Sequence, residues 1–398
     1  MTVQLRPWII VWDHFGPYHY ARVTALMKKM AVPIIPVQVA RHTMTYNWEG
    51  STLQEGCAEV IALQDDLPAE KLGFLKVLRC ASRLFRELKP AVVFCPSYWP
   101  PRSLAIVFVA RLAGARTVMM NESHAGTERS GAIGRHVKSA LLKLFNAALL
   151  GGAPHRRYFA SLGMAKERIF TGYDAVDNDY FQQAANEARA DATKVRRELR
   201  LPERYILNLG RMVSKKNLSL LIKAYFTMRK RGCGVGAKLV LVGSGEEETG
   251  LKRLCDVLQL AWQDLSDSGE GLPSADVLFY GFRQIDQNPV FYALADCFVL
   301  PSLYEEWGLV VNEAMACGLP VLVSQTAGCA EDLVLEGQNG YTFSPESEED
   351  LAQRLGEICD NGKLRRRMGT ESLNIIEKWG CENFAENAIR AAEKALST

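Results

Sequence analysis

The first half of the chain alternates between short apolar runs and longer segments in which apolar residues recur at helical spacing. Short apolar runs predict buried strands, and spacings of three and four residues predict helices. The predicted strands are residues 8–12, 33–39, 57–63, 91–95 and 117–121, with a further short apolar piece at 147–150. The predicted helices are residues 17–30, 69–88, 102–113, 131–145 and 155–162. Such alternation indicates a parallel sheet with helices on both faces.

The second half restarts the same alternation. Its predicted strands are residues 205–209, 238–242, 277–280, 297–300 and 320–323. Its predicted helices are residues 217–229, 246–258 and 309–317, followed by a mainly helical stretch, 364–396, with a break at Gly380. The insert 264–273 is rich in Ser, Gly and Asp, which predicts a loop.

A polar segment separates the two halves. Residues 174–203 are rich in Ala, Glu, Asp and Arg, and a helix is expected at 183–199. We therefore predict an α/β fold of two doubly wound, Rossmann-like parallel-sheet domains that face a central cleft, where such sheets bind ligands. The predicted parts are an N-terminal domain at 1–180, a linker at 181–203, a second domain at 204–378, and a C-terminal helix at 379–398 that packs back on the first domain.

Composition narrows the class of protein. The chain has 398 residues and contains no apolar run of about 18 residues, so no membrane span is expected. The N-terminus leads directly into the first strand and lacks the layout of a signal peptide, which favours a cytoplasmic protein. The ten cysteines form no C-x-x-C pair, so we expect reduced thiols rather than disulfides or a zinc site.

Charge is unevenly distributed along the chain. Residues 1–180 carry 22 Lys and Arg against 14 Asp and Glu (22 − 14 = +8), whereas the remainder carries 25 against 31 (25 − 31 = −6). A basic first half fits an anionic acceptor or peripheral contact with the anionic inner face of a membrane, and it equally fits a solvated basic surface. The basic segment 135–145 has apolar residues at helical spacing, so it either lies on a membrane or packs on the core.

The most informative motif follows the predicted strand 297–300. A helix opens near Gly308 and closes at 318–320, and Glu305 and Glu313 bracket its start, eight positions apart. The free N–H groups of a helix start favour anions such as phosphate. Carboxylates beside them repel phosphate but accept hydrogen bonds from sugar hydroxyls. The pattern therefore indicates a ligand with phosphate and sugar parts, a nucleotide-sugar.

Glycine turns follow three strands of the second half. In the first, Gly210 is followed by Arg211, which can fork onto a phosphate, and by Lys216, which can act as a point charge. The alternative is that both are solvated surface cations. The second turn contains Gly243 and Gly245. After Gly281, the residues from Phe282 to Ile285 are expected to line a base pocket.

Together these motifs, G-R-x(4)-K, G-x-G and E-x(7)-E-A-M-A-x-G-x-P, resemble the retaining, nucleotide-sugar-dependent family 4 glycosyltransferases with the GT-B fold. The resemblance is strong over residues 204–350 and extends in outline to the whole chain. It implies that Arg211 and Lys216 contact the donor diphosphate, that Glu305 contacts donor-sugar hydroxyls, and that Glu313 holds the ribose. It also implies that backbone at Gly308 and Leu309 approaches the phosphates or the sugar.

The sequence departs from the family pattern at several positions. Glu306 and Trp307 stand where the family often has Gly and Phe, so the resemblance gives Glu306 no role. The turn after the first strand has Gly16 in place of the usual Gly-Gly, and Gly16 is expected to bring backbone near the diphosphate. His124 lies where many members have an active-site histidine, which makes it a candidate contact for the donor sugar or the acceptor. A structural role for this loop histidine is the alternative.

The resemblance implies a hexosyltransferase that moves a sugar from an NDP-sugar to an acceptor hydroxyl, with retention, on a saccharide, a glycolipid precursor or a small-molecule glycoside. The first domain would bind the acceptor and the second the donor. No covalently bound cofactor, no metal and no nucleic acid are expected, and the D-x-D at 177–179 is interpreted as a loop and capping feature. Two alternatives stay open: a GT-B-fold sugar-nucleotide epimerase or hydrolase, and a non-catalytic sugar-nucleotide-binding partner.

Overall fold

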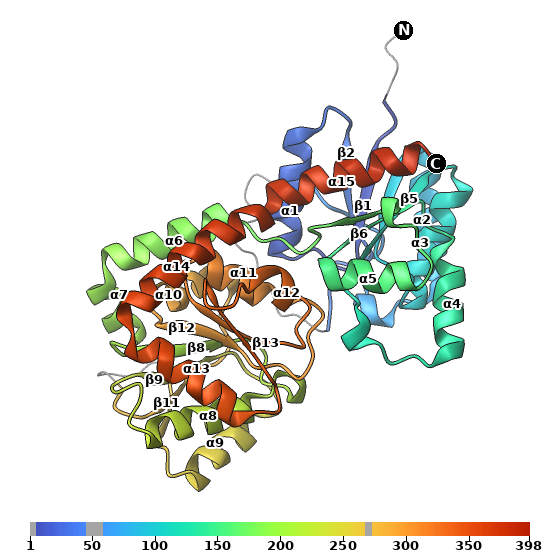
Figure 1. Cartoon of the computed structure of the whole chain (residues 1–398). Coiled ribbons are helices and arrows are strands. Elements are labelled where there is room, and N and C mark those ends of the chain that lie inside the picture. Colours follow the sequence, from blue (N-terminus) through green and yellow to red (C-terminus); the bar gives the residue numbers. More distant parts are fainter. Residues whose placement is uncertain (1–4, 45–58, 267–272) are drawn as a thin grey trace. The chain divides into compact units, whose positions relative to one another are not determined.

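The computed structural model describes residues 5–44, 59–266 and 273–398 (Figure 1). The chain divides into two compact units. The first unit comprises residues 1–177 and 379–398, and the second unit comprises residues 178–378. Each is described by itself below.

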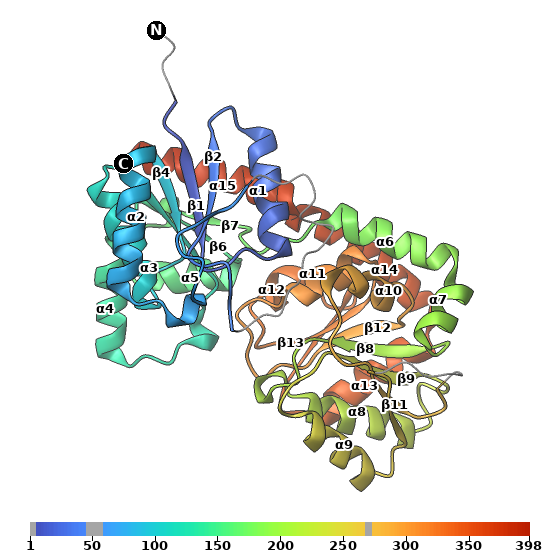
Figure 2. The same ribbon diagram turned by 180° about the vertical axis from the view of Figure 1, so that it is seen from behind.

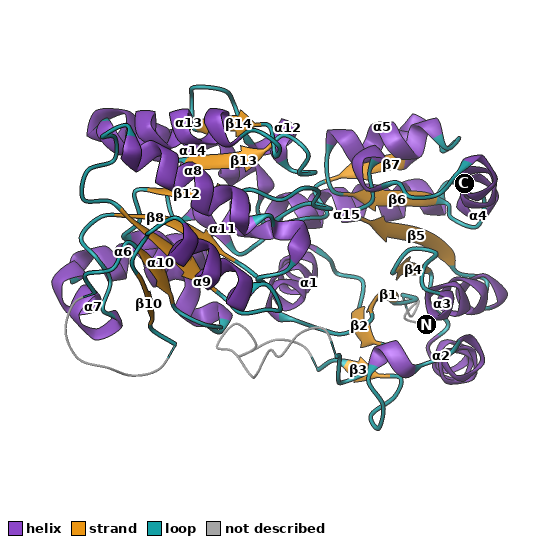
Figure 3. Ribbon diagram, turned by 90° about the horizontal axis from the view of Figure 1, so that it is seen from below, coloured by secondary structure: helices purple, strands orange, loops and turns teal. Residues whose placement is uncertain are grey.

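The first unit is built on a seven-stranded parallel sheet with the strand order β3-β2-β1-β4-β5-β6-β7 (Figure 3). This order contains the 3-2-1-4-5-6 sequence of a doubly wound dinucleotide-binding sheet. Its strands are β1 (Trp8–Trp12), β2 (Ile34–Gln38), β3 (Ile61–Ala62), β4 (Val92–Cys95), β5 (Arg116–Asn121), β6 (Ala147–Leu150) and β7 (Ile169–Thr171). Its helices are α1 (Pro17–Lys29), α2 (Phe74–Leu88), α3 (Pro101–Leu112), α4 (Ala132–Leu142), α5 (Ala153–Ser161) and α15 (Cys381–Leu396).

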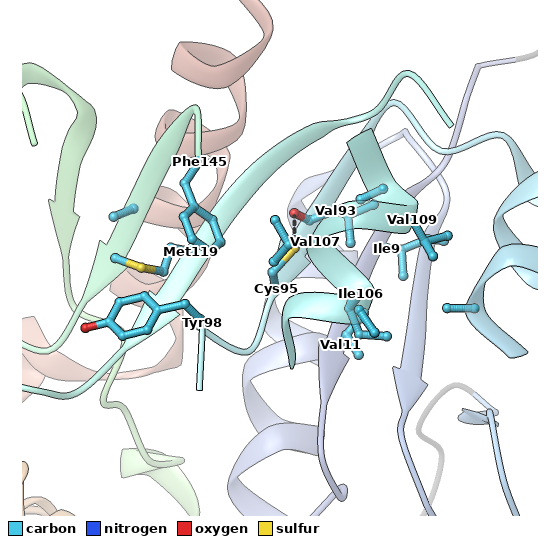
Figure 4. Close-up of a cluster of buried hydrophobic side chains, with 14 of the residues drawn as sticks. Ile9, Val11, Val93, Cys95, Tyr98, Ile106, Val107, Val109, Met119 and Phe145 are labelled. Carbon is cyan, nitrogen blue, oxygen red and sulfur yellow. Dashed lines mark hydrogen bonds between the residues drawn. The ribbon is translucent and has the colours of Figure 1, made fainter. Parts of the chain in front are cut away.

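Both faces of this sheet are buried because successive side chains of a strand point to opposite sides. In β1, Ile9 and Val11 belong to a buried cluster that includes residues of α2, α3 and α5. Figure 4 shows part of this cluster. Trp8, Ile10 and Trp12 belong instead to the cluster that includes residues of α1 and α15. Figure 2 gives the opposite view of these helices and the sheet. Helices on both faces make the first unit the doubly wound domain that the alternation predicts.

The C-terminal helix α15 completes the core of the first unit. The predicted helical stretch 364–396 is two helices, α14 (Gly362–Ile376) and α15, and Gly380 is the N-cap of α15. Phe384 and Ala388 of α15 are fully buried in the cluster that also contains residues of β1, β4, β5 and β6. The end of the chain therefore packs on a sheet whose strands lie more than two hundred residues earlier in the sequence.

The second unit also has a seven-stranded parallel sheet, with the order β10-β11-β9-β8-β12-β13-β14. Its strands are β8 (Tyr205–Leu209), β9 (Lys238–Val242), β10 (Trp262–Asp264), β11 (Val277–Phe279), β12 (Cys297–Leu300), β13 (Val321–Ser324) and β14 (Gly340–Phe343). Its helices are α6 (Asn178–Ala190), α7 (Ala192–Leu199), α8 (Leu218–Lys230), α9 (Glu248–Val257), α10 (Asn288–Ala293), α11 (Leu309–Ala316), α12 (Ala330–Leu333), α13 (Glu348–Asp360) and α14.

The segment 181–203, expected to be a linker, is helical and belongs to the second unit. The expected helix at 183–199 is divided at Asp191, whose side chain accepts a hydrogen bond from Lys194 N and caps α7. Helix α6 packs against α10 and α11, and its Phe181 and Ala185 are buried. Phe181 and two alanines are therefore enough to bury one face of an otherwise polar helix, whose composition resembles that of a solvated linker.

Several short elements have no prediction from the sequence: β7, β10, β14, α10, α12 and α13. Except for α13, each has at most six residues, too few for a periodic pattern to stand out. The predicted strand at 57–63 is partly outside the described residues, and only Ile61–Ala62 is a strand. The described cysteines are free thiols. Within the described ranges, no helix is long and apolar enough to cross a membrane.

Candidate functional site

The candidate site of the second unit lies where its sheet changes direction. Strands β8 and β12 are neighbours at the centre of the sheet, but the chain leaves β8 toward β9 on one side and continues from β12 toward β13 on the other. Ligands bind beyond the carboxyl ends of the strands at such a switch point. The turn that begins at Gly210 and the loop that contains Glu305 follow these two strands.

The glycine turns lie against one another. Gly243 N–H donates to the carbonyl oxygen of Gly281 (2.7 Å), and Gly210 N–H donates to that of Val242 (2.9 Å). A Cβ atom on Gly243 would lie 2.0 Å from Gly210 O, and one on Gly245 would lie 2.3 Å from Met212 O. These two glycines are therefore required for the turns after β8 and β9 to pack backbone against backbone. Phe282, which follows the third turn, is 47% exposed.

The β8 turn brings two lysines to the loop after β12. Residues 214–216 form a short 3₁₀ turn. Asn217, in the left-handed conformation, donates from Nδ2 to the carbonyl oxygens of Pro301 (3.2 Å) and Pro345 (2.9 Å). Leu303 N–H donates to Lys215 O (2.8 Å). Arg211 is exposed at the start of this turn. The turn and the loop are thus fastened together through their backbones.

Glu305 is the centre of an ion-pair cluster. Lys215 Nζ lies 3.0 Å from Glu305 Oε1 and 2.8 Å from Glu306 Oε2. Lys216 Nζ donates to Glu305 Oε2, which also accepts from Ser302 Oγ (3.2 Å). The Glu305 side chain is only 10% exposed, and those of Lys215 and Lys216 are 20% and 13% exposed. Each oxygen of Glu305 is therefore held by a different lysine, and low exposure strengthens both pairs.

The electrostatics of this cluster keep Glu305 and Lys215 charged. Burial acts to raise the pKa of the Glu305 carboxyl, but Lys216 and Lys215 outweigh it and hold that pKa below its ordinary value. Burial acts to lower the pKa of Lys215, and the carboxylates of Glu305 and Glu306 outweigh it and raise that pKa. A carboxylate kept ionised in this way is suited to accept hydrogen bonds and unsuited to act as a general acid.

A neighbouring loop fixes the backbone that carries Glu305. After β13, Gly328 N–H donates to Glu305 O (3.0 Å) and Cys329 N–H donates to Trp307 O (3.3 Å). The loop at 327–331 thus lies directly beside Glu305. Glu331 lies in the first turn of α12.

Helix α11 begins where the motif predicts. Gly308 is its N-cap, with φ +107°, a conformation that side-chain-bearing residues rarely adopt, and Leu309 is its first residue. The Trp307 indole Nε1–H donates to Asn312 Oδ1 (2.8 Å), and both side chains are buried. The tryptophan in place of the family phenylalanine is therefore accommodated by a polar partner one turn into α11.

The second glutamate of the motif lies inside the unit. Glu313 is fully buried in α11, and the hydroxyl of Tyr292 in α10 donates to its Oε2 (3.0 Å). Glu305 and Glu313 therefore have different environments. The first is balanced by two cations, and the second receives a phenolic hydrogen bond.

Gly16, the candidate in the first unit, has an ordinary extended backbone with φ −107°. Its N–H donates to Nδ1 of His19 (2.9 Å), which caps α1. Nearby, Asp13 pairs with Arg102 (2.7 Å). The single glycine of this turn therefore has no conformation that requires glycine, and its N–H is already part of a capping hydrogen bond.

His124 follows β5 and is 6% exposed. Its Nδ1 accepts from Gly126 N–H (3.2 Å), and its ring packs edge-on against that of His155 at a centroid distance of 5.2 Å. The capping contact is the structural role that the sequence leaves open as the alternative. A second role would have to use the other ring nitrogen.

A buried polar cluster lies next to these histidines. Arg22 donates from Nε to Ala175 O (2.9 Å), and its Nη2 lies 3.9 Å from Asp174 Oδ1, with both side chains buried. Burial and the neighbouring charge of Glu122 raise the pKa of Asp174 well above its ordinary value, against the opposing effect of Arg22. Arg22 and Asp174 therefore lie in the interior of the first unit, where burial disfavours the charged form of the Asp174 carboxyl.

The D-x-D segment takes part in helix capping. Asn178 begins α6 and donates from Nδ2 to Ile376 O (2.8 Å), and Asp179 lies in the first turn of that helix. Among the residues that the structure describes, no group of three or more His, Cys, Asp or Glu side chains could hold a metal ion.

Comparison with known proteins identifies the second unit. Residues 191–374 match the family described as glycosyl transferases group 1. This segment is a glycosyl transferases group 1 domain. A curated relative from Methanocaldococcus jannaschii, named an uncharacterized glycosyltransferase, is 29% identical over 195 residues, which are 49% of this chain and 46% of the relative. The match thus spans about half the length of the curated relative.

Solved structures resemble the whole chain. A glycosyltransferase from Rickettsia africae has a TM-score of 0.73 at 14% identity, covering 99% of each chain. Anabaena HepE, crystallised in complex with UDP and glucose, has a TM-score of 0.69 at 18% identity, covering 96% of this chain and 98% of its own. At these identities the likeness concerns the fold, and it confirms the predicted GT-B fold class.

Sequence reasoning missed three residues of the site: Lys215, Tyr292 and Asn217. The sequence pattern that could have predicted Lys215 is a pair of adjacent lysines, 215 and 216, after one strand and a pair of adjacent glutamates, 305 and 306, after the neighbouring strand. Tyr292 lies on a six-residue helix that the sequence does not reveal, and nothing in the local pattern points to its contact with Glu313.

The contact between Trp307 and Asn312 generates a stability prediction. Trp307→Phe removes the donor from a buried acceptor and should lower the free energy of unfolding by about 1–3 kcal/mol. Replacing the acceptor as well, in the double variant Trp307→Phe/Asn312→Leu, should recover part of this loss. Chemical denaturation of the two single variants and the double variant measures both. Fully additive losses would show that the hydrogen bond is not what holds the pair.

Proposed function

We propose that the protein is a retaining glycosyltransferase that moves a sugar from an NDP-sugar to an acceptor hydroxyl. The observation that carries the proposal is the cluster at the sheet's switch point, where Lys216 and Glu305 lie in contact. A cation for a diphosphate and a carboxylate for sugar hydroxyls thus lie side by side. The group 1 domain, the named glycosyltransferase relative and a structural neighbour crystallised with UDP and glucose support the same reading.

The donor would lie along the carboxyl ends of β8, β9 and β12. Arg211 and Lys216 would contact its diphosphate, with the glycine turns at Gly210 and Gly243 allowing close approach of backbone. Glu305 would accept from donor-sugar hydroxyls, and the N-terminus of α11 at Gly308 and Leu309 would face the phosphates or the sugar. Glu313 would hold the ribose hydroxyls, a contact for which it must exchange or share its hydrogen bond from Tyr292. Gly245 and Phe282 would lie on the base side.

The proposed catalytic role of Arg211, Lys216 and the start of α11 is to stabilise the negative charge that develops on the leaving diphosphate. Cleavage of the bond between the anomeric carbon and the phosphate oxygen leaves negative charge on the diphosphate. Arg211, Lys216 and the free N–H groups at the start of α11 would stabilise this charge as it develops. These cations supply the positive charge, so we propose that no divalent metal is needed. Front-side attack by the acceptor, assisted by the leaving phosphate, is the route consistent with retention.

We assign the acceptor to the first unit, whose sequence departs most from the family pattern. The acceptor would be a saccharide, a glycolipid precursor or a small-molecule glycoside. His124 is the candidate group to contact the donor sugar or the acceptor, through the ring nitrogen that does not cap residues 125–127. Gly16 is the weaker candidate for a backbone contact, because its N–H already donates to His19.

The two alternatives differ in what they consume. An epimerase or hydrolase turns over the donor without an acceptor, and a non-catalytic partner binds it without turnover. The assay is therefore a panel of UDP-, GDP-, ADP- and dTDP-sugars, incubated in excess EDTA with and without acceptor candidates. We expect turnover of one donor class that requires an acceptor and survives EDTA. Turnover without any acceptor would support the first alternative, and loss of activity in EDTA would contradict metal independence.

Within that assay, Lys216→Ala should lower turnover by about 10²–10³-fold, the effect of removing one preorganised stabiliser of transition-state charge. Lys223→Ala is the matched control, because Lys223 is an exposed lysine of α8 in the same unit. Equal turnover of the Lys216 variant and the control at saturating donor would show that Lys216 does not stabilise the transition-state charge.

We further propose that the first unit contacts an anionic membrane through α4, at the cytoplasmic face. Ile133 and Val137 are one helical turn apart and are 83% and 54% exposed, whereas the helix buries only Leu142. Arg135 in this helix and Lys143 at its C-cap add positive charge, within a first half whose balance is +8 (22 − 14 over residues 1–180). Exposed aliphatic side chains flanked by cations suit the interface of an anionic bilayer.

Sedimentation with vesicles tests this contact. The protein should bind phosphatidylglycerol vesicles more tightly than phosphatidylcholine vesicles. Ile133→Asp/Val137→Asp should weaken binding by about 10-fold or more, because two aliphatic side chains no longer enter the bilayer. Leu75→Asp on α2, where Leu75 is 65% exposed, is the control and should bind normally. Equal binding of both variants would show that α4 is not the contact.

A further inference from the structure

The two lysines of the β8 turn are not equivalent with respect to Glu305. Lys216 is the lysine of the family motif, whereas Lys215 is an additional cation that the motif does not assign. Lys215 holds Glu305 Oε1 (3.0 Å), and Lys216 holds Oε2. The other carboxylate that binds Lys215, Glu306, stands where the family often has glycine. Lys215 and Glu306 therefore form an ion pair beside Glu305 to which the motif gives no role.

This arrangement raises a problem for donor binding. The inference rests on the proposed function, in which Lys216 must bind the diphosphate. In the structure, however, its ammonium is engaged with Glu305 Oε2. When it does so, Glu305 loses one of its two counter-ions while its side chain is only 10% exposed. Without Lys215, Glu305 would then have no cation beside it, and a carboxylate with so little exposure and no cation carries a large desolvation penalty. That penalty would oppose the binding of any diphosphate.

We infer that Lys215 is a positioning residue that serves as the standing counter-ion of Glu305 and thereby releases Lys216 to bind the nucleoside diphosphate. Lys215 keeps Oε1 paired before and after donor binding. Oε2, vacated by Lys216, then becomes available to accept from a donor-sugar hydroxyl. Glu305 Oε2 thus exchanges its lysine partner for a sugar hydroxyl, while Lys215 continues to balance the charge of the carboxylate.

The surroundings of Lys215 fit a fixed rather than a mobile cation. Glu306 Oε2 holds its ammonium from a second side at 2.8 Å, and the ring of Tyr304 lies beneath it at 5.6 Å from the centroid. Its backbone carbonyl accepts from Leu303 N–H (2.8 Å). Among the side chains that the structure describes, the Lys216 ammonium pairs with Glu305 alone, so an incoming diphosphate has one ion pair to replace.

The test is a double-mutant cycle on nucleoside diphosphate binding, measured by calorimetry with UDP, GDP and ADP in turn. Lys215→Met should weaken binding of the preferred nucleotide by about 10-fold, because Lys216 can then leave Glu305 only by stranding its charge. In the Glu305→Gln background there is no charge to strand. Adding Lys215→Met to that background should therefore leave the affinity unchanged. Lys223→Met controls for the loss of a lysine elsewhere in the unit.

Each outcome of the cycle supports or overturns the counter-ion role of Lys215. Binding by the Glu305→Gln/Lys215→Met variant at the Glu305→Gln affinity shows that loss of Lys215 does not prevent folding. Equal weakening in both backgrounds, or no weakening in either, overturns the counter-ion role while the proposed function stands. If the unaltered protein binds none of the nucleotides, the proposed function fails and the counter-ion role fails with it.

Discussion

The carboxylate and backbone of Glu305 connect three loops of the second unit. Its two oxygens engage the lysines that follow β8, its own loop follows β12, and its carbonyl oxygen accepts from Gly328 after β13. The switch point of the sheet brings these loops together, but only the ion pairs fix where the charges lie. The other candidate donor contacts are arranged around this point: the glycine turns on one side and the start of α11 on the other.

The two glutamates of the motif are held by opposite means. Glu305 stays ionised because lysines surround it, whereas Glu313 is enclosed in α11 with the hydroxyl of Tyr292. The lysines hold the pKa of the Glu305 carboxyl below its ordinary value, so this group is unsuited to donate a proton to a leaving group. The difference between the two glutamates favours two separate binding roles along one ligand over a paired acid and base, and it leaves charge stabilisation to the cations and the helix start.

The sequence predicted the fold well where strands are buried throughout and mainly apolar, as at Trp8–Trp12 and Tyr205–Leu209, because such a run is typical of a buried parallel strand. The turns that carry Lys216 and Glu305 lie in contact, as expected for turns that follow adjacent parallel strands. The sequence did not reveal α6 as part of the second unit, since only Phe181 and two alanines form the buried face of that polar helix. Nor did it reveal Lys215 or Tyr292, whose partners are about 90 and 21 residues away.

The most direct measurement is a crystal structure of the protein with the nucleotide-sugar that it binds. The account predicts the diphosphate at the turn after β8, with Lys216 Nζ moved from Glu305 onto a phosphate oxygen. It predicts Lys215 still on Glu305, a sugar hydroxyl on the vacated oxygen, and the ribose hydroxyls on Glu313. A nucleotide bound away from these turns, or a diphosphate in place with Lys216 still paired to Glu305, would contradict it.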